Sequence, residues 1–181
     1  MNRFLPVTFF AVLLFASCVN DPAKVNSFSK NAKIPLQTVN DVDLIYSDSA
    51  HAKIHMTAPV MEDFGGINPY QEMPKGVKVE FYDENQKVNS YLTSNYAINK
   101  KREQIMEAKN DVVVVNIKGE KLNTERLIWD GKKRRIHTDA FVTITTKDQV
   151  ITGTGLESDE RFEEYEIKNI SGIINFKDDL K

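Results

Sequence analysis

The sequence predicts an all-β fold, and three observations support that prediction. No proline occurs after Pro74, so the long C-terminal part keeps every backbone donor that a strand ladder needs. Val, Ile and Thr are frequent there, and they favour a pleated, half-buried surface. Turn-forming dipeptides such as Asp130-Gly131 separate the apolar stretches. No stretch after residue 40 keeps a helical period.

Length and composition limit the class of protein. The chain has 181 residues, which is enough for one domain. Its 24 Lys and Arg residues nearly balance its 26 Asp and Glu residues, which argues against a nucleic-acid-binding protein and against an acidic tail. A hydrophobic fraction of 41% is typical of a folded soluble domain. The single cysteine, Cys18, excludes an intrachain disulfide and a Cys-based metal cluster.

The N-terminal segment is typical of a bacterial lipoprotein. Arg3 is the only charge among the first 20 residues, and residues 4–17 are almost wholly apolar. These 14 residues are too few for a hydrocarbon core of about 30 Å, which takes roughly 20, so they indicate a secretory signal. Cys18 directly follows Ala16-Ser17, as in a lipobox whose cysteine is lipidated, although Phe15 stands where Leu is usual. The alternative is an ordinary signal peptide with an incidental cysteine.

The chain therefore divides into three expected segments. We expect residues 1–17 to be a lipoprotein signal peptide, with Cys18 as the lipid attachment site. Residues 18–40 are expected to form the lipidated tether, because they are polar and show little periodicity. Residues 41–181 are expected to form the β domain.

Alternating and continuous apolar runs predict individual strands. Val77, Val79 and Phe81 alternate with polar or amphipathic neighbours, as does the pair Val142 and Ile144. Residues 112–115 are four consecutive valines, which predicts a strand covered on both faces. Charged turns are expected at residues 83–85, 100–102, 118–119 and 130–131.

One sequence motif occurs three times in the C-terminal part. The copies cover residues 91–116, 122–144 and 151–172, at a spacing of about 30 residues. In the second copy, Leu122-x-Thr124-x-x-Leu127 leads through a charged turn to another apolar strand, and the first copy is aligned to it from Tyr91. Each copy predicts a twisted hairpin that cannot bury its apolar face alone. Stacked hairpins then give a layered sandwich or roll.

No catalytic, cofactor or metal site is predicted. The three histidines do not form a ligand set, and Gly153-x-Gly155 lacks the third glycine of a dinucleotide-binding loop. No nucleophile elbow, zinc-protease motif or phosphate-binding loop occurs. The carboxylates between residues 157 and 164 are interpreted as a solvated edge. We therefore expect a protein that is not an enzyme and that needs no cofactor.

Several strings in the C-terminal half are distinctive. They are LNTERLIWD at residues 122–130, IHTD at 136–139 and ITGTGLESD at 151–159, followed by Phe162 and Tyr165-x-Ile167. Together they resemble the LptC family of periplasmic lipopolysaccharide-export proteins, within a wider OstA-like group. The resemblance covers roughly residues 40–175, and the run at 152–159 is its most specific part.

This resemblance implies a fold, a role and partners. The fold would be an open antiparallel β-jellyroll. The role would be that of a non-enzymatic carrier, which passes lipopolysaccharide from an inner-membrane ABC transporter to the next soluble periplasmic jellyroll protein. Members usually carry an N-terminal transmembrane helix, which the lipobox replaces here. The implied place is the periplasmic face of the inner membrane, and the sequence leaves the outer membrane open.

Candidate site residues follow from the repeats. Val112, Val114, Val142 and Ile144 occupy matching places in two copies and are expected to line an acyl-chain interior, together with Trp129. Gly153 and Gly155 in the last copy are expected at the edge where a partner protein docks. The alternative to a carrier is a structural or interaction β-sandwich lipoprotein with no lipid cargo, and a periplasmic hydrolase comes third.

Overall fold

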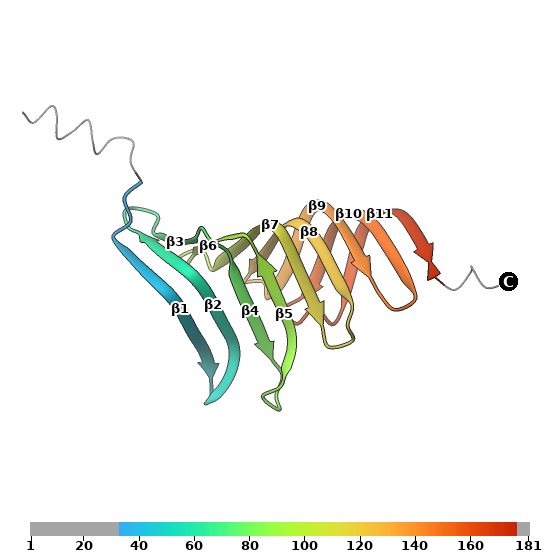
Figure 1. The fold of residues 1–181 in the computed structure, drawn as a ribbon, viewed down its shortest axis with the longest axis horizontal. Coiled ribbons are helices and arrows are strands. Elements are labelled where there is room, and N and C mark those ends of the chain that lie inside the picture. The colour runs from blue at the N-terminus through green and yellow to red at the C-terminus, as the bar shows by residue number, and fades with distance from the viewer. Residues whose placement is uncertain (1–32, 177–181) are drawn as a thin grey trace, which may run out of the picture. The chain divides into compact units, whose positions relative to one another are not determined.

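The computed structural model describes residues 33–176, which form one antiparallel sheet of 11 strands (Figure 1). The all-β, jellyroll-like fold expected from the sequence is confirmed. All the strands belong to the compact unit that begins at Pro35. They are β1 (Gln37–Asp48), β2 (His51–Phe64), β3 (Tyr70–Met73), β4 (Val77–Tyr82), β5 (Val88–Ser94), β6 (Tyr96–Lys100), β7 (Ile105–Asn116), β8 (Lys121–Asp130), β9 (Arg135–Thr145), β10 (Gln149–Asp159) and β11 (Tyr165–Asn175).

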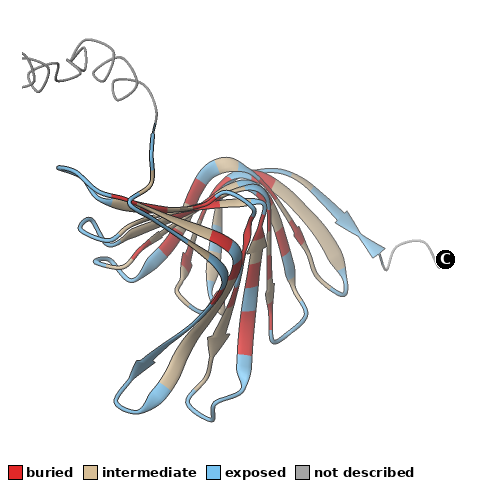
Figure 2. Ribbon diagram, turned by 60° about the vertical axis from the view of Figure 1, so that its left-hand side comes forward, coloured by how far each residue is buried: buried red, intermediate tan, exposed pale blue. Residues whose placement is uncertain are grey.

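The sheet is a meander whose strands bend, so that it folds over on itself. β7 pairs with β6 through its first half and with β5 through its second half. In the same way, β2 pairs with β4 early and with β3 late. The two halves face each other as two walls, which diverge from the line of bends in Figure 2.

We name the two halves wall A and wall B. Wall A contains β4, β5 and the parts of the long strands that continue their pairing, at residues 112–116, 121–124 and 142–145. Wall B contains β3, β6 and the corresponding residues 105–109, 126–130 and 135–138. β1 pairs only with β2 and β11 only with β10, so among the described residues these two strands are the open edges.

Residues with left-handed backbone mark the bends of β1, β7 and β10 and the turn from β3 to β4. Asp41, Gly76, Asn110, Asp111 and Gly155 all have positive φ, and they lie between the wall B and wall A parts of their strands. The pairing register also shifts there, as it does in β7 between Lys109 and Val112. Glycine, asparagine and aspartate tolerate this conformation best, because a larger or branched side chain would clash with its own backbone.

Buried hydroxyls satisfy backbone carbonyls at the bends. Ser94 Oγ donates to the Tyr96 carbonyl at 3.0 Å, and Thr124 Oγ1 donates to the Phe141 carbonyl at 2.8 Å. A bend interrupts the ladder, and a buried carbonyl left without a partner would cost free energy. The bends are therefore stabilised by specific side chains.

The apolar core lies between the walls and is most tightly closed across β7–β10. Its most deeply buried side chains come from both walls and are at most 1% exposed: Met73, Ala97, Val112, Val114, Leu122, Val142, Ile144, Leu156 and Phe162. Figure 2 shows these buried stretches in the central strands, with exposed residues at the turns and edges. Burying such side chains stabilises the fold by about 1.5–3 kcal/mol each before entropy is counted.

The predicted strand patterns are largely confirmed, with one correction. Val77 and Val79 are buried, Val142 and Ile144 are buried, and the charged turns fall where they were expected. The prediction that the valine run is covered on both faces is wrong. Val113 and Val115 are only half-buried, because the outer face of the sheet has no layer over it among residues 33–176.

The repeats correspond to successive bent hairpins, but the first copy is offset by one residue. Leu92 and Ser94 point inward and match Leu122 and Thr124, whereas Tyr91 is exposed. Tyr91 and Leu122 look equivalent in sequence because each is followed by a threonine two residues later and by another large apolar or aromatic residue five residues later. Burial decides the register, since a shift of one residue moves a side chain to the other face.

The segment expectations lie partly outside the described residues. Cys18 and most of the expected tether precede residue 33, and the last five residues follow residue 176. β1 begins at Gln37, so the expected boundary at residue 41 lies inside this strand. Within residues 33–176, we find no helix with the length and apolarity needed to cross a membrane.

The bend between β3 and β4 gives a test of this architecture. Gly76 has φ +90°, and a Cβ built there would lie 2.5 Å from the Ser94 carbonyl oxygen across the bend. Gly119 has a similar φ of +79° in an open turn with no neighbour within 4 Å. Both alanine substitutions incur a left-handed strain of about 1–2 kcal/mol, but only Gly76→Ala adds a backbone clash.

We therefore expect Gly76→Ala to lower the free energy of unfolding by about 3 kcal/mol or more, and Gly119→Ala by about 1 kcal/mol. Urea denaturation followed by circular dichroism measures both. Equal losses for the two variants would contradict a close approach of the backbone at the bend.

Candidate functional site

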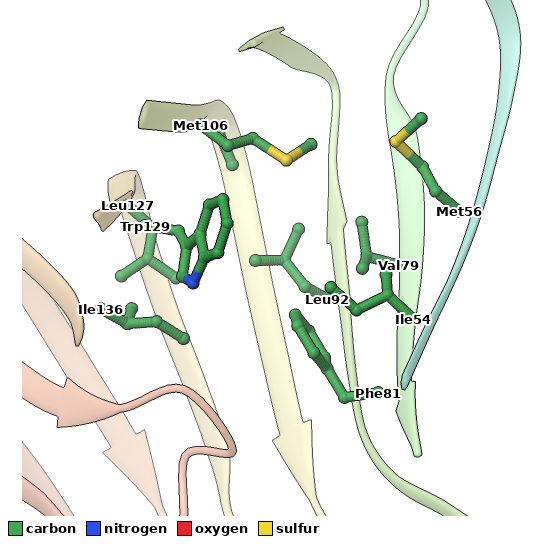
Figure 3. A pocket seen from close by; sticks show the side chains of 10 residues that line it. Ile54, Met56, Val79, Phe81, Leu92, Met106, Leu127, Trp129 and Ile136 are labelled. Atoms are coloured by element: carbon green, nitrogen blue, oxygen red, sulfur yellow. The ribbon is translucent and has the colours of Figure 1, made fainter. Parts of the chain in front are cut away.

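An apolar cavity lies where β2, β4 and β5 face the wall B parts of β7, β8 and β9 (Figure 3). Its interior volume is about 90 Å³, and the space rises to about 570 Å³ when the open mouth and adjoining solvent are counted. Figure 3 shows the side chains of the two walls turned toward this shared space. The lining residues are Ile54, Met56, Val79, Phe81, Leu92, Met106, Ala108, Leu127, Trp129 and Ile136.

The cavity lining is hydrocarbon and thioether with one polar atom. That atom is Nε1 of Trp129, which donates to Glu160 Oε1 at 3.0 Å and is therefore already satisfied. The lining offers no acid, base or nucleophile that could take part in catalysis. It does remove apolar ligand surface from water, which favours the binding of hydrocarbon chains.

The candidate interior residues fall into two places. Trp129 lines the cavity. Val112, Val114, Val142 and Ile144 all point inward, but they lie in the closed core and not at the cavity surface. Their inward direction agrees with the repeat pattern, and their assignment to a lipid path stays a proposal.

Sequence reasoning missed most of the cavity. Ile54, Met56, Phe81 and Met106 face the cavity from three different strands. Each follows the alternation of its own strand, so the signal for an inward side chain was present. No pattern along the chain shows that the walls separate here and close further along.

Charged side chains beside the cavity point away from it. His55 lies between two cavity residues of β2 and turns outward, with Nε2 2.8 Å from Asp43 Oδ1 and Nδ1 3.3 Å from Glu80 Oε2. Hydrogen bonds first to Asp43 and then to Glu80 raise the pKa of His55. This contact joins the edge strand β1 to β4 across β2.

Glu107 makes a second outward cluster on β7. Its Oε1 lies 2.5 Å from Arg126 Nε and 3.3 Å from Lys109 Nζ. Burial works to raise the pKa of Glu107, but the hydrogen bonds from Arg126 and Lys109 outweigh it and lower that pKa. Among the described residues, no group of three or more His, Cys, Asp or Glu side chains is arranged to hold a metal ion.

Two basic turns adjoin the cavity at the tip of wall B. Residues 101–104 and 131–134 lie side by side, because Gly131 N donates to the Gln104 carbonyl at 2.9 Å. A Cβ built on Gly131 would lie 2.7 Å from the Trp129 ring, so these turns lie directly against the cavity wall. The turns and their flanking residues contain Lys100, Lys101, Arg102, Lys132, Lys133, Arg134 and Arg135.

The open edges carry exposed apolar side chains. β11 and the residue after it expose Ile170, Ile173, Ile174 and Phe176. Gly153 and Gly155, expected at the docking edge, lie on β10 and are therefore one strand inside it. A Cβ on Gly153 would meet Ile167 and the Asn169 carbonyl of β11 at 2.5–2.6 Å. These glycines thus shape how β11 pairs, while β11 itself is the edge.

Comparison with known proteins gives one family match. Residues 7–174 match the family model described as lipopolysaccharide-assembly, LptC-related. No curated protein matches the chain.

Proposed function

Because the chain belongs to the LptC-related lipopolysaccharide-assembly family, we propose that it is a non-enzymatic carrier, which receives lipopolysaccharide from an inner-membrane ABC transporter and passes it to the next periplasmic jellyroll protein. Membership gives the chain a role in lipopolysaccharide transport, and the family is associated with the periplasmic side of the inner membrane. The observation that supports the finer proposal is the apolar cavity between the walls.

The cavity has the chemistry that acyl chains require. Each methylene group moved from water into it contributes about 0.8 kcal/mol. Met56 and Met106 lie among the lining residues, and flexible thioether side chains adapt to ligands of varied shape. Because the sequence contains no nucleotide-binding motif, the transporter would supply the energy for directional movement.

The basic turns support a defined orientation of the cargo. Lipopolysaccharide combines acyl chains with a phosphorylated sugar head. The cations at the tip of wall B lie beside Trp129, so chains in the cavity would place the anionic head next to them. Lys133 and Arg134 also pair with Asp130 and Glu160, which moderates this attraction.

The edge strand β11 supports a docking role at the C-terminal end. It pairs only with β10, so one side of its backbone can receive an added strand from a partner protein. Its exposed isoleucines would be covered by that partner, which is the usual reason for a cluster of exposed apolar side chains.

The membrane attachment proposed here is a lipid anchor. Residues 1–17 would be removed as a signal peptide, and Cys18 would carry the acyl chains at the start of a tether reaching the β domain. This arrangement replaces the transmembrane helix usual in the family. The inner membrane is the place proposed for the anchor.

A role without lipid cargo is the second candidate, and the exposed apolar edges favour it. A structural or interaction lipoprotein would also present open strands to protein partners. The two candidates differ in whether the cavity binds a ligand, and the single tryptophan allows a direct measurement.

We expect lipopolysaccharide, or its lipid A part, to change the fluorescence of Trp129 in a saturable way. The chain has one Trp, so the signal comes from the cavity alone. Ala108→Phe fills part of the cavity and should weaken binding about tenfold or more, which corresponds to about 1.4 kcal/mol. Deacylated lipopolysaccharide should bind far more weakly than lipid A.

Ala140→Phe is the matched control, because Ala140 is half-buried and does not line the cavity. It should leave the affinity unchanged. Absence of any saturable signal from either lipid would favour the interaction lipoprotein, and equal binding of the deacylated form would exclude an acyl-chain cavity.

Two equally exposed isoleucines test the docking edge. Ile174 on β11 and Ile117 in the β7–β8 turn are each 64% exposed. Ile174→Lys should weaken binding of the partner jellyroll about tenfold or more, because a charge on an edge strand opposes the addition of another strand. Ile117→Lys should leave that binding unchanged. Pull-down titration of the full chain measures both, and equal effects would count against the β11 edge.

Loss of the proposed anchor has a simple readout. Cys18→Ala should leave the precursor uncleaved by the lipoprotein peptidase and unlabelled by a fatty-acid probe in cells. If the variant still incorporates palmitate, Cys18 is not the lipid attachment site.

A further inference from the structure

The loop between β10 and β11 joins the tips of both walls. Residues 160–164 form this loop. On the wall B side, Glu160 accepts from Trp129 Nε1 at 3.0 Å and from Arg134 Nε at 3.1 Å. Trp129 is the penultimate residue of β8, and Arg134 is in the turn after it, so both mark the tip of wall B.

The same loop is bonded to the tip of wall A. Asn89 Nδ2 donates to Glu163 Oε1 at 3.1 Å, and Asn116 Nδ2 donates to the Phe162 carbonyl at 3.2 Å. Asn89 lies near the start of β5 and Asn116 ends β7, which places both opposite the bend. Residues 160–164 therefore span the opening between the free ends of the two walls.

Phe162 fastens the loop to the core. It is 1% exposed, has φ +58°, and its ring stacks on Tyr165 with 5.5 Å between ring centres. A phenylalanine in left-handed backbone is strained, so its burial and the hydrogen bonds around it must compensate for that strain. The loop is thus a closed contact between the walls, not a free surface turn.

The position of this loop matters for a cargo with a large polar head. If acyl chains lie between the walls while the head remains outside, the head can move along the sheet only where the two wall tips are not joined. The bonds of residues 160–164 reach β5, β7 and β8, which also line the cavity, so the loop joins the wall tips at the cavity itself. The edge strand β11 lies beyond this point in the strand order. Residues 160–164 consequently obstruct this movement of the head even if the interior has room.

We propose that residues 160–164 form a clasp, which retains lipopolysaccharide in the cavity and has to open before the cargo reaches the C-terminal edge. This proposal rests on the carrier function proposed above. Phe162 acts as the positioning residue of the clasp, because it anchors the loop in the core. The four side-chain hydrogen bonds to Glu160, Phe162 and Glu163 are the contacts that opening breaks.

A reversible crosslink that locks the clasp tests this proposal. The experiment uses the full chain in cells whose lipopolysaccharide export depends on this protein. The lock uses the double variant Asn89→Cys and Glu163→Cys. Cysteine is shorter than the side chains it replaces, so a short bis-methanethiosulfonate crosslinker is needed to join the two thiols. A reductant cleaves the crosslink and reopens the lock. A photoreactive amino acid is placed either at Met106, in the cavity, or at Ile167, which packs against the core on β11.

With the clasp locked, capture of lipopolysaccharide at Met106 should persist, and capture at Ile167 should fall about tenfold or more. Reductant should restore capture at Ile167. Each single-cysteine chain, treated in the same way, should behave as the unlocked protein. Equal capture at Ile167 in the locked and unlocked states would overturn the clasp, whereas no capture at either position without the lock would overturn the carrier function itself.

A loosened clasp gives the opposite test and needs no crosslink. Asn89→Ala removes one hydrogen bond to wall A without opening a cavity in the apolar core. The ratio of capture at Ile167 to capture at Met106 should rise about twofold or more. Asn123→Ala on the half-buried outer side of β8 is the control and should leave the ratio unchanged. An unchanged ratio in Asn89→Ala would also overturn the clasp.

Discussion

The bend in the middle of each long strand is the constraint on which the rest of the structure depends. An antiparallel meander buries its apolar face only if something covers it, and residues 33–176 provide no second layer. By bending, the sheet covers its own inner face, so Val112 on wall A can pack in the same core as Leu156 on wall B. The left-handed residues Gly76 and Gly155 lie at two of these changes of direction, where a side chain would be strained.

The same inward series of side chains builds both the stable core and the cavity. On β7, Met106 and Ala108 line the cavity, and Val112 and Val114 lie in the closed core. Where the walls meet, Val, Leu and Ile interdigitate and stabilise the fold. Where the walls separate, longer and more flexible side chains such as Met106 surround open space. A binding space of this kind needs no special motif, because it arises wherever the two walls of the bent sheet do not close.

The sequence was sufficient for the strands and insufficient for the space between them. Alternation, turn dipeptides and the absence of proline after Pro74 specified an all-β meander, because these signals are local. The alignment of Tyr91 with Leu122 failed, since only packing reveals which of two adjacent side chains points inward. The sequence predicts a solvated edge for the carboxylates at residues 157–164, but Glu160 and Glu163 bond to strands more than 30 residues away in sequence. Contacts of that range have no signature in a single sequence.

An open roll suits an amphiphilic cargo better than a closed barrel does. A barrel would force the polar head either to enter the interior or to stop movement of the chains, whereas a slot between two walls lets the head remain in water. The open slot weakens the connection between the wall tips, and the four side-chain hydrogen bonds of residues 160–164 restore it. Each such bond contributes about 0.5–1.5 kcal/mol, or more where a charged group takes part. In the proposed clasp, contacts of this size would hold the loop closed and could still be broken during transport. Because β11 lies beyond these contacts in the strand order, cargo that followed the proposed route would reach this edge strand and its exposed isoleucines last.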